Sequence, residues 1–598
     1  MSLAAPSRCA SLTLAELVNE AQRLQHAGQA AAAERAYLDW IADGPPGLRH
    51  VACFNLGTMR SADGRNELAM EDYRQALALK PDFAHARVNL GHLLERRGEH
   101  EAALAQWREA IDGGAPVALR LHALNNRGRL LESRRRFAEA EACLRESLTL
   151  DPLQPNVVQH YVHLRQKQCA WPVYEAVGEL TPNQLLTGTS LLAMMSASDD
   201  PALQLLSAQR FAHERCPKPG PVALHSTMPP RSGRIRVGYL SGDLHMHAVG
   251  LLMPELLELH DRSRFEVWGF CWTPESDQPQ RQRLVAGLDH LVRLGGVDDA
   301  TAARLIAEAG IDVLVDLQGL TSGARPAILG WRAAPVQVGY LGLPGTSALP
   351  GLDWILADDY VMPPELEPYC TERPIRLPHC YQVSDRRREV APRPERARYG
   401  LPEQAFVYCS FNNNFKFTPE MFGAWMRTLA QVPGSVLWLL ADNDTARENM
   451  LAQADANGVA RDRLVFAPRV PPPEYLARFQ CADLVLDTFP YNAGTTASDA
   501  LWMGTPILTR SGRSYISRMA GSLLTAVGLP DLITESLAHY ERLAVSLGRH
   551  PARVASYKRY LAEQGRGSPL FDMPQIVRDI EAAFERLALA HRGRQQPA

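Results

Sequence analysis

The sequence has no long apolar run and no pair of closely spaced cysteines. No stretch of the 598 residues approaches the apolar length that a membrane span requires. The ten cysteines are scattered and form no CxxC pair, which argues against a zinc site or a disulfide framework and favours reduced thiols. The first residues, MSLAAPSRCASLTLAEL, lack an apolar signal core. We therefore expect a cytoplasmic protein that does not bind membranes.

The sequence also lacks an excess of charge of one sign. Its formal net charge of −3 at pH 7 gives no general attraction to nucleic acid, and we expect no nucleic-acid partner. Its 46% hydrophobic and 22% charged residues are typical of a globular protein. The length of the chain requires several domains.

The N-terminal quarter contains a repeated pattern of small and large residues. Matching residues lie 34 positions apart: Gly57 and Gly91, Gly64 and Gly98, Ala69 and Ala103, Tyr73 and Trp107, Ala76 and Ala110. Small residues let two helices approach, and large residues fill the space to the next helix pair. The period and the residues resemble the tetratricopeptide repeat over residues 11–154, which predicts about four helical hairpins.

An asparagine recurs in the first helix of each repeat, at Asn19, Asn55, Asn89 and Asn126. Asparagine is a mediocre helix former, so its recurrence needs a reason. Its amide can donate to and accept from a peptide backbone of any sequence. We predict that these residues face a bound peptide; the alternative is that they satisfy polar groups between neighbouring repeats.

The remainder of the chain predicts two α/β lobes. Short β-branched runs alternate with helical segments from Arg234 onwards, which is typical of a parallel sheet covered on both faces. The expected parts are a helical extension over 155–230, a first lobe over 231–385, a charged, proline-rich linker over 386–403, a second lobe over 404–568, and a terminal helix and tail over 569–598. The predicted fold class is an all-α repeat array followed by two Rossmann-like lobes, whose ligands bind beyond the carboxyl ends of the strands.

The segment DTFPYNAGTTASDALW predicts an anion site. Thr495 and Thr496 open a helix after a strand and a loop, and the N–H groups of a helix N-terminus suit a diphosphate. Asp499 lies one turn further in, where a carboxylate is better placed to accept ribose hydroxyls. The alternative is an ordinary helix cap.

Two further residues follow predicted strands. Lys416, after FVYCSFN, can neutralise the charge that develops on a nucleoside-diphosphate leaving group; the alternative is a solvated lysine. His247, in SGDLHMHAVG, can take a proton from a hydroxyl or orient it. His245, two residues away, is the alternative for that role, and a loop histidine can also be purely structural.

The triplet Asp442-Asn443-Asp444 matches the acidic pattern with which some glycosyltransferases hold a divalent ion. It follows a strand and precedes a helix, so we interpret Asp444 as the helix N-cap. We expect no metal and no other cofactor.

Together these segments resemble the O-linked N-acetylglucosamine (O-GlcNAc) transferase family, which includes the plant SPINDLY-type enzymes. The stretches that carry the resemblance are RIRVGYLSGDLHMHAVG, GYLGLPGTSALPGLDWILAD, FNNNFKFTPE and SVLWLL, in this order behind the repeats. The resemblance covers nearly the whole chain. It implies a GT-B architecture and an inverting, metal-independent transfer of N-acetylglucosamine (GlcNAc) from UDP-GlcNAc to Ser or Thr of proteins.

The resemblance also implies roles for individual residues. It places His247 and Lys416 in the catalytic region and the asparagine series on the positions that grip an acceptor peptide. The donor-binding positions that it implies are Asn413, Lys416, Tyr475, Arg478, Thr495, Thr496, Asp499, Pro344, Gly345 and Thr346.

The chain departs from the animal members of that family. It has no large insertion between the lobes, it has fewer repeats, and Tyr475 and Gly494 stand where those enzymes have donor-contacting histidines. An aromatic ring can still stack on uracil. Three alternatives stay open: fucose transfer from GDP-fucose, glucose transfer from UDP-glucose to asparagine, and a catalytically inactive repeat scaffold.

Overall fold

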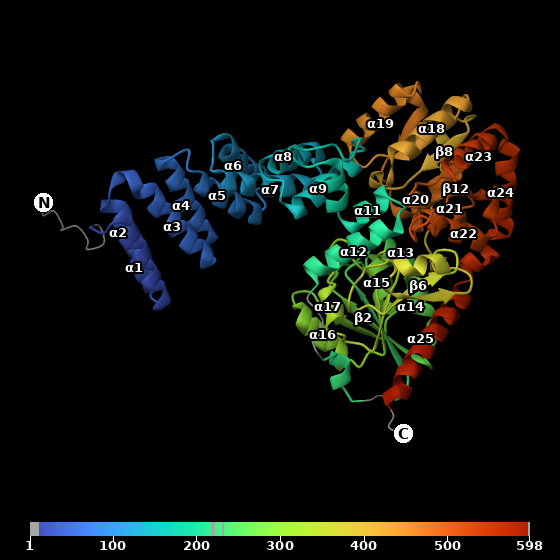
Figure 1. Cartoon of the computed structure of the whole chain (residues 1–598), viewed down its shortest axis with the longest axis horizontal. Helices are drawn as coiled ribbons and strands as arrows, with labels where there is room; N and C mark the ends of the chain where they lie inside the picture. Colours follow the sequence, from blue (N-terminus) through green and yellow to red (C-terminus); the bar gives the residue numbers. More distant parts are fainter. Residues whose placement is uncertain (1–10, 217–221, 230–231, 596–598) are drawn as a thin grey trace. The chain divides into compact units, whose positions relative to one another are not determined.

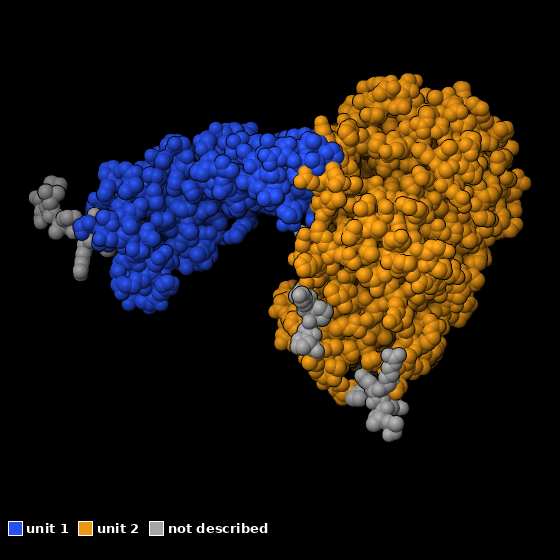
Figure 2. All heavy atoms as spheres, in the orientation of Figure 1, with its two compact units in different colours: residues 1–164, 176–182 blue, residues 165–175, 183–598 orange. Residues whose placement is uncertain are grey.

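The computed structural model of the chain describes residues 11–216, 222–229 and 232–595. These divide into two compact units, shown in Figure 2: residues up to 164 with 176–182, and residues 165–175 with those from 183 onwards. The predicted boundary between residues 230 and 231 lies outside the described residues. No helix in the described ranges is long and apolar enough to cross a membrane.

The first unit consists of paired helices, as the repeat pattern predicts (Figure 1). Their bounds are α1 Leu14–His26, α2 Ala30–Asp43, α3 Arg49–Ala62, α4 Asn66–Leu79, α5 Ala84–Arg96, α6 His100–Asp112, α7 Val117–Ser133 and α8 Phe137–Leu150. A further helix, α9 Pro155–Lys167, follows the four pairs, and its last residues belong to the second unit. Gly64 and Gly98 end the first helix of their pairs with φ of 77° and 83°, a left-handed conformation that glycine adopts without strain.

The recurring small residues allow close helix contact within each pair. A Cβ atom on Gly91 of α5 would lie 2.4 Å from Nε1 of Trp107 on α6. The Trp107 ring is completely buried, and its Nε1 donates to the carbonyl of Val88 at 3.2 Å. The glycine at this repeat position is therefore required by the large residue opposite.

Along the chain, the repeats are followed by α10 Pro182–Gly188, α11 Leu191–Ala197 and α12 Pro201–Arg215, and the first sheet comes after them. The first sheet has the strand order β3-β2-β1-β4-β5-β6-β7, and all of its pairs are parallel. Its strands are β1 Ile235–Ser241, β2 Phe265–Cys271, β3 His290–Arg293, β4 Val313–Asp316, β5 Val336–Gly339, β6 Trp354–Asp358 and β7 Arg373–Leu377. Its helices are α13 Ala248–Leu252, α14 Pro254–Leu259, α15 Pro279–Ala286, α16 Asp299–Glu308 and α17 Ala327–Gly330.

The C-terminal helix α25 (Met573–Gln595) returns to the first lobe and contacts α14, β5 and β7 (Figure 1). Phe584 of α25 is fully buried in the core of that lobe. His260 joins the two segments: it contacts Tyr239 Oη through Nε2 at 2.7 Å and Glu581 Oε1 through Nδ1 at 2.9 Å. The end of the chain thus completes the first sheet's core.

The second sheet is also parallel, with the order β10-β9-β8-β11-β12-β13. Its strands are β8 Val407–Ser410, β9 Val436–Leu440, β10 Leu464–Ala467, β11 Leu484–Leu486, β12 Ile507–Arg510 and β13 Ile533–Thr534. Its helices are α18 Pro419–Gln431, α19 Asp444–Ala456, α20 Pro472–Arg478, α21 Thr495–Trp502, α22 Met519–Val527, α23 Leu537–Arg549 and α24 Pro551–Glu563. The predicted succession of a helical repeat array and two α/β lobes is confirmed.

Buried polar contacts join the two lobes. Asp358, at the carboxyl end of β6, is 3% exposed and accepts from Ser522 Oγ of α22 at 2.5 Å. Tyr360, which follows β6, contacts Ser511 Oγ through its hydroxyl at 2.7 Å. Gly521 of α22 leaves room for the Tyr360 ring, since a Cβ there would lie 2.4 Å from it. These contacts hold the carboxyl end of β6 against the second lobe.

The close contact between α5 and α6 predicts the effect of Gly91→Ala. Alanine favours a helix, but its Cβ would overlap the Trp107 ring, so we expect the unit to lose about 2 kcal/mol of stability. Hydrogen exchange of the α5 and α6 amides in the full chain measures this loss. Gly47→Ala is the control: its Cβ meets nothing within 4 Å, and the change should stay within about 0.5 kcal/mol. Equal exchange in both variants would contradict the packing argument.

Candidate functional site

The loops after β8 and β11 meet at the carboxyl edge of the second sheet, because these two strands are neighbours. Lys416, after β8, donates from Nζ to the carbonyl of Asn492 at 3.2 Å. The same Nζ lies 3.9 Å from the ring centroid of Tyr491. Lys416 therefore lies beside the loop that leads into α21. Asn413, three residues earlier, is exposed at the same edge.

A buried carboxylate accompanies Lys416. Asp487, which follows β11, is fully buried and accepts from Thr509 Oγ1 at 2.6 Å and from the Ala493 amide at 2.8 Å. Burial raises the pKa of Asp487 to about 6 and lowers the pKa of Lys416 to about 8, while the attraction between the two groups opposes both shifts. An anion that approaches this edge would stabilise the Lys416 ammonium.

Thr495 and Thr496 are the first residues of α21, as predicted. The N-cap residue is Gly494, which has no side chain, so the threonines are not the cap and no side chain caps the first turn of the helix. Both threonines are partly exposed. The helix dipole and the first-turn N–H groups favour an anion at this position.

The neighbouring helix α20 carries Tyr475 and Arg478. Arg478 is 1% exposed, and its guanidinium carbon lies 3.9 Å from the Phe411 ring centroid and 4.6 Å from that of Tyr475. Burial raises the pKa of Tyr475, while a hydrogen bond with Thr496 opposes the increase. Arg478 thus supports the Tyr475 ring from within the core, and the ring adjoins the start of α21.

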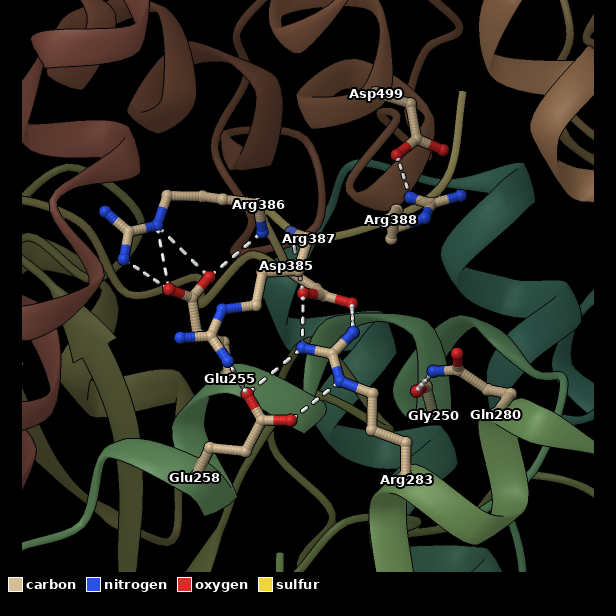
Figure 3. Close-up of polar contacts among 10 residues, drawn as sticks. All are labelled: Gly250, Glu255, Glu258, Gln280, Arg283, Asp385, Arg386, Arg387, Arg388 and Asp499. Carbon is tan, nitrogen blue, oxygen red and sulfur yellow. Dashed lines mark hydrogen bonds and ion pairs between the residues drawn. The ribbon is translucent and has the colours of Figure 1, made fainter. Parts of the chain in front are cut away.

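Asp499 is buried one turn inside α21. It forms an ion pair with Arg388, and the side chains of the pair are 7% and 9% exposed, respectively (Figure 3). Burial raises the pKa of Asp499, and the Arg388 guanidinium opposes that increase. Arg388 lies in the segment that the sequence marked only as a linker, since its dense charge is typical of a solvated connection.

His247 is the N-cap of α13 at the carboxyl end of β1. Its side chain is 45% exposed, and its Nδ1 lies 3.6 Å from Oδ2 of Asp243. Desolvation lowers the pKa of His247, and the nearby Asp243 carboxylate opposes the decrease. His245 approaches the other oxygen of Asp243 at 3.8 Å. Gln318, after β4, donates to Asp243 at 3.1 Å and so orients this loop.

Pro344, Gly345 and Thr346 belong to the loop after β5. Thr346 is 6% exposed, and its hydroxyl donates to Glu372 Oε2 at 2.7 Å. The Ser347 amide donates to the other carboxylate oxygen at 2.8 Å. Glu372 therefore fixes the shape of this loop, a role that no sequence pattern indicated.

The acidic triplet is engaged in local structure. Asp442 forms an ion pair with Arg469. The N-cap of α19 is Asn443, which accepts from the Ala446 amide at 2.8 Å, so the assignment of the cap to Asp444 was wrong by one residue. Within the described ranges, no group of three or more His, Cys, Asp or Glu is arranged to hold a metal ion.

The predicted asparagine series lies on α1, α3, α5 and α7, the first helix of each pair. Asn19 is exposed, and Asn55, Asn89 and Asn126 are half-buried. The Asn89 amide donates to Tyr73 Oη of the preceding pair at 3.2 Å, and the Asn126 amide donates to the His122 carbonyl at 2.8 Å. These two amides therefore satisfy local polar groups, which is the alternative that the sequence left open.

Comparisons with known proteins identify a family and related folds. The model of glycosyl transferase family 41 matches residues 218–393 and 392–580, and tetratricopeptide-repeat models match residues 59–98 and 120–150. A probable UDP-N-acetylglucosamine–peptide N-acetylglucosaminyltransferase SEC of Arabidopsis thaliana is 33% identical over 371 residues, which is 61% of this chain and 38% of that protein. The Arabidopsis relative named SPINDLY is 29% identical over 367 residues, which is 59% of this chain and 39% of that protein.

A solved structure extends the similarity to the repeats. A mutant of the Thermobaculum terrenum O-GlcNAc transferase is 25% identical with a TM-score of 0.61, covering 99% of this chain and 100% of that one. The chain spans about two fifths of the length of the curated relatives that it matches.

The lowered pKa of Lys416 predicts how nucleoside-diphosphate binding depends on pH. Lys416 is charged below its pKa of about 8, so the affinity for UDP should be constant from pH 7 to about 8 and fall as the pH rises further. Calorimetric titration between pH 7 and about 9.5 measures this, and Lys416→Met should remove the dependence. Lys558→Met is the matched control, because Lys558 pairs with Asp483 at the amino end of β11, the opposite edge of the sheet. An unchanged pH profile in Lys416→Met would contradict the assignment.

Proposed function

The chain belongs to glycosyl transferase family 41, and from this premise we propose that it transfers GlcNAc from UDP-GlcNAc to Ser or Thr hydroxyls of proteins. The observation that carries the proposal is the gathering of Lys416, Tyr475, Asp499 and the start of α21 at one edge of the second sheet. A cation and a helix N-terminus suit a diphosphate, an aromatic ring suits the base, and a carboxylate suits ribose hydroxyls. These groups match the parts of a nucleotide sugar.

In the proposed reaction the acceptor oxygen forms a bond to the anomeric carbon while the bond from that carbon to UDP breaks, with inversion of configuration. One proton is released for each UDP formed. Lys416 and the dipole of α21 stabilise the charge that develops on the departing diphosphate, without a metal ion. His247 and the loop of Pro344, Gly345 and Thr346 belong to the first lobe, where they orient the acceptor hydroxyl and the sugar.

We further propose that the helical repeats bind the backbone of the acceptor. The support is the position of Asn19, Asn55, Asn89 and Asn126 on the first helices of successive pairs, because stacked repeats form a continuous binding surface. Contacts to backbone amides would admit many acceptor sequences. We place the protein in the cytoplasm, since the described cysteines are free thiols, as a reducing compartment keeps them.

The donor assignment predicts selective stabilisation by UDP-GlcNAc. A ligand at 100 times its Kd stabilises the folded state by about 2.7 kcal/mol, which thermal unfolding detects readily. We expect this stabilisation with UDP-GlcNAc and UDP and none with GDP-fucose. With UDP-GlcNAc and protein acceptors, mass spectrometry should find the added N-acetylhexosamine on Ser or Thr. Lys416→Ala should reduce the rate of transfer by a factor of about 100 to 1,000, because it removes a cation that stabilises the leaving group.

Lys558→Met serves again as the control and should transfer as the wild type does. Stabilisation by GDP-fucose alone would overturn the donor assignment. Equal transfer by the wild type and Lys416→Ala would overturn the site, and sugar found on asparagine would redirect the proposal to an N-glycosyltransferase. Nucleotide binding without any transfer would favour the inactive scaffold.

The acceptor assignment predicts a change in KM for protein acceptors. Each lost amide hydrogen bond is equivalent to about 1 kcal/mol, so the double variant Asn55→Ala/Asn89→Ala should raise KM about tenfold or more. Its Kd for UDP should be unchanged. Gln75→Ala, which removes an exposed amide from the second helix of a pair, is the matched control. An unaltered KM in the double variant would remove the asparagine series from acceptor binding.

A further inference from the structure

Consecutive residues of the segment 385–388 are held by different lobes. Asp385 accepts two hydrogen bonds from the Arg283 guanidinium of α15, at 2.7 and 3.0 Å. The next residue, Arg386, binds Glu255 of α14, which is 1% exposed, with its backbone amide at 3.0 Å and its Nε at 2.9 Å. Arg387 contacts Glu258 of the same helix at 3.2 Å. Three successive side chains are thus bound to the first lobe.

Arg388 turns to the second lobe instead. Figure 3 shows its side chain extended to Asp499 of α21, whereas Asp385, Arg386 and Arg387 lie against residues of the first lobe. The Nη1 atom of Arg388 donates to Oδ1 of Asp499. Its Nη2 is buried and has no hydrogen-bond partner among the described residues. A guanidinium N–H that is buried without an acceptor is costly, so this atom points to a ligand that supplies one.

The neighbours of the Arg388–Asp499 pair indicate which part of a ligand lies there. Tyr475 lies near enough that the charges of both Asp499 and Arg388 act on its pKa. Thr495 and Thr496, at the N-terminus of α21, lie one turn before Asp499 on the same helix. In the proposed function the base lies at Tyr475 and the diphosphate at the start of α21. The sugar that connects a base to a diphosphate is the ribose.

We propose that Arg388 is a ribose-binding residue of the donor site. Through Nη1 it holds the Asp499 carboxylate so that the second oxygen accepts from a ribose hydroxyl, and through Nη2 it donates to a ribose oxygen. The inference rests on the proposed function, because it takes a nucleoside diphosphate as the ligand. The contacts of Asp385, Arg386 and Arg387 present Arg388 to the second lobe from a fixed part of the first lobe.

The test compares UDP with 2′,3′-dideoxy-UDP, which lacks both ribose hydroxyls, by calorimetric titration of the full chain. The wild type should bind UDP about tenfold or more tightly than the dideoxy nucleotide, since charge-assisted hydrogen bonds are lost with the hydroxyls. Arg388→Met should bind the two nucleotides equally, within a factor of about 2, while its Kd for the dideoxy nucleotide stays at the wild-type value. Arg387→Met removes the same charge from the preceding residue and should keep the wild-type preference for UDP over the dideoxy nucleotide.

Arg388→Met leaves the buried Asp499 without its cation, so a variant that removes both charges is also needed. Arg388→Met/Asp499→Asn restores neutrality and should show the same loss of ribose preference, with a melting temperature close to that of the wild type. The proposal is overturned if Arg388→Met keeps the preference for UDP, or if it weakens both nucleotides equally.

The same titrations distinguish a failure of this inference from a failure of the donor assignment. If the wild type binds GDP and not UDP, the donor assignment fails, and the same comparison with GDP and 2′,3′-dideoxy-GDP tests Arg388, because both nucleotides contain ribose. If the wild type binds neither nucleotide, both proposals are overturned.

Discussion

The buried carboxylate of Asp358 connects the two lobes, and the rest of the proposed site depends on that connection. Asp358 accepts from the backbone amide of Tyr381 at 2.8 Å and from Ser522 of the second lobe at 2.5 Å. Burial raises the pKa of Asp358, and these hydrogen bonds oppose the increase. Removing any one donor would leave part of a buried charge unsatisfied, which is strongly destabilising. The carboxyl end of β6 is therefore held firmly against α22.

The second lobe shows how a parallel sheet assembles a site from distant residues. Lys416 and Thr495 are far apart in the sequence, but β8 and β11 are neighbours, so the loops that follow them meet at one edge. Asp487 is buried at this edge and accepts hydrogen bonds from Thr509 and Ala493. Because its oxygens are engaged in this way, it does not compete with a bound anion for the Lys416 ammonium. Burial and strand order together produce a cation beside a helix N-terminus, which is the chemistry a diphosphate needs.

The segment 385–388 does more than connect the two lobes, because its side chains bind to both. A chain that only connected the lobes would be solvated, yet Arg386 binds the buried Glu255 and Arg388 binds the buried Asp499. The chain turns at Arg386 and Arg387, and after this turn Arg388 reaches the second lobe while the three residues before it contact the first. A nucleotide at Asp499 would therefore lie next to Arg388, whose three preceding residues are bound to the first lobe.

Local patterns in the sequence determined the repeats, the two sets of strands and the start of α21. The period of Gly57 and Gly91 follows from packing within one helix pair, and the Thr495–Thr496 helix start follows from the strand and loop before it, so both are readable over short distances. The tertiary structure alone decided what contacts Asp499 and Thr346. Arg388 and Glu372 lie 111 and 26 residues away from them, respectively, and in unrelated local sequence. Ion pairs of this kind depend on which side chains the fold buries together, and the density of charge in VSDRRREV carries no information about burial.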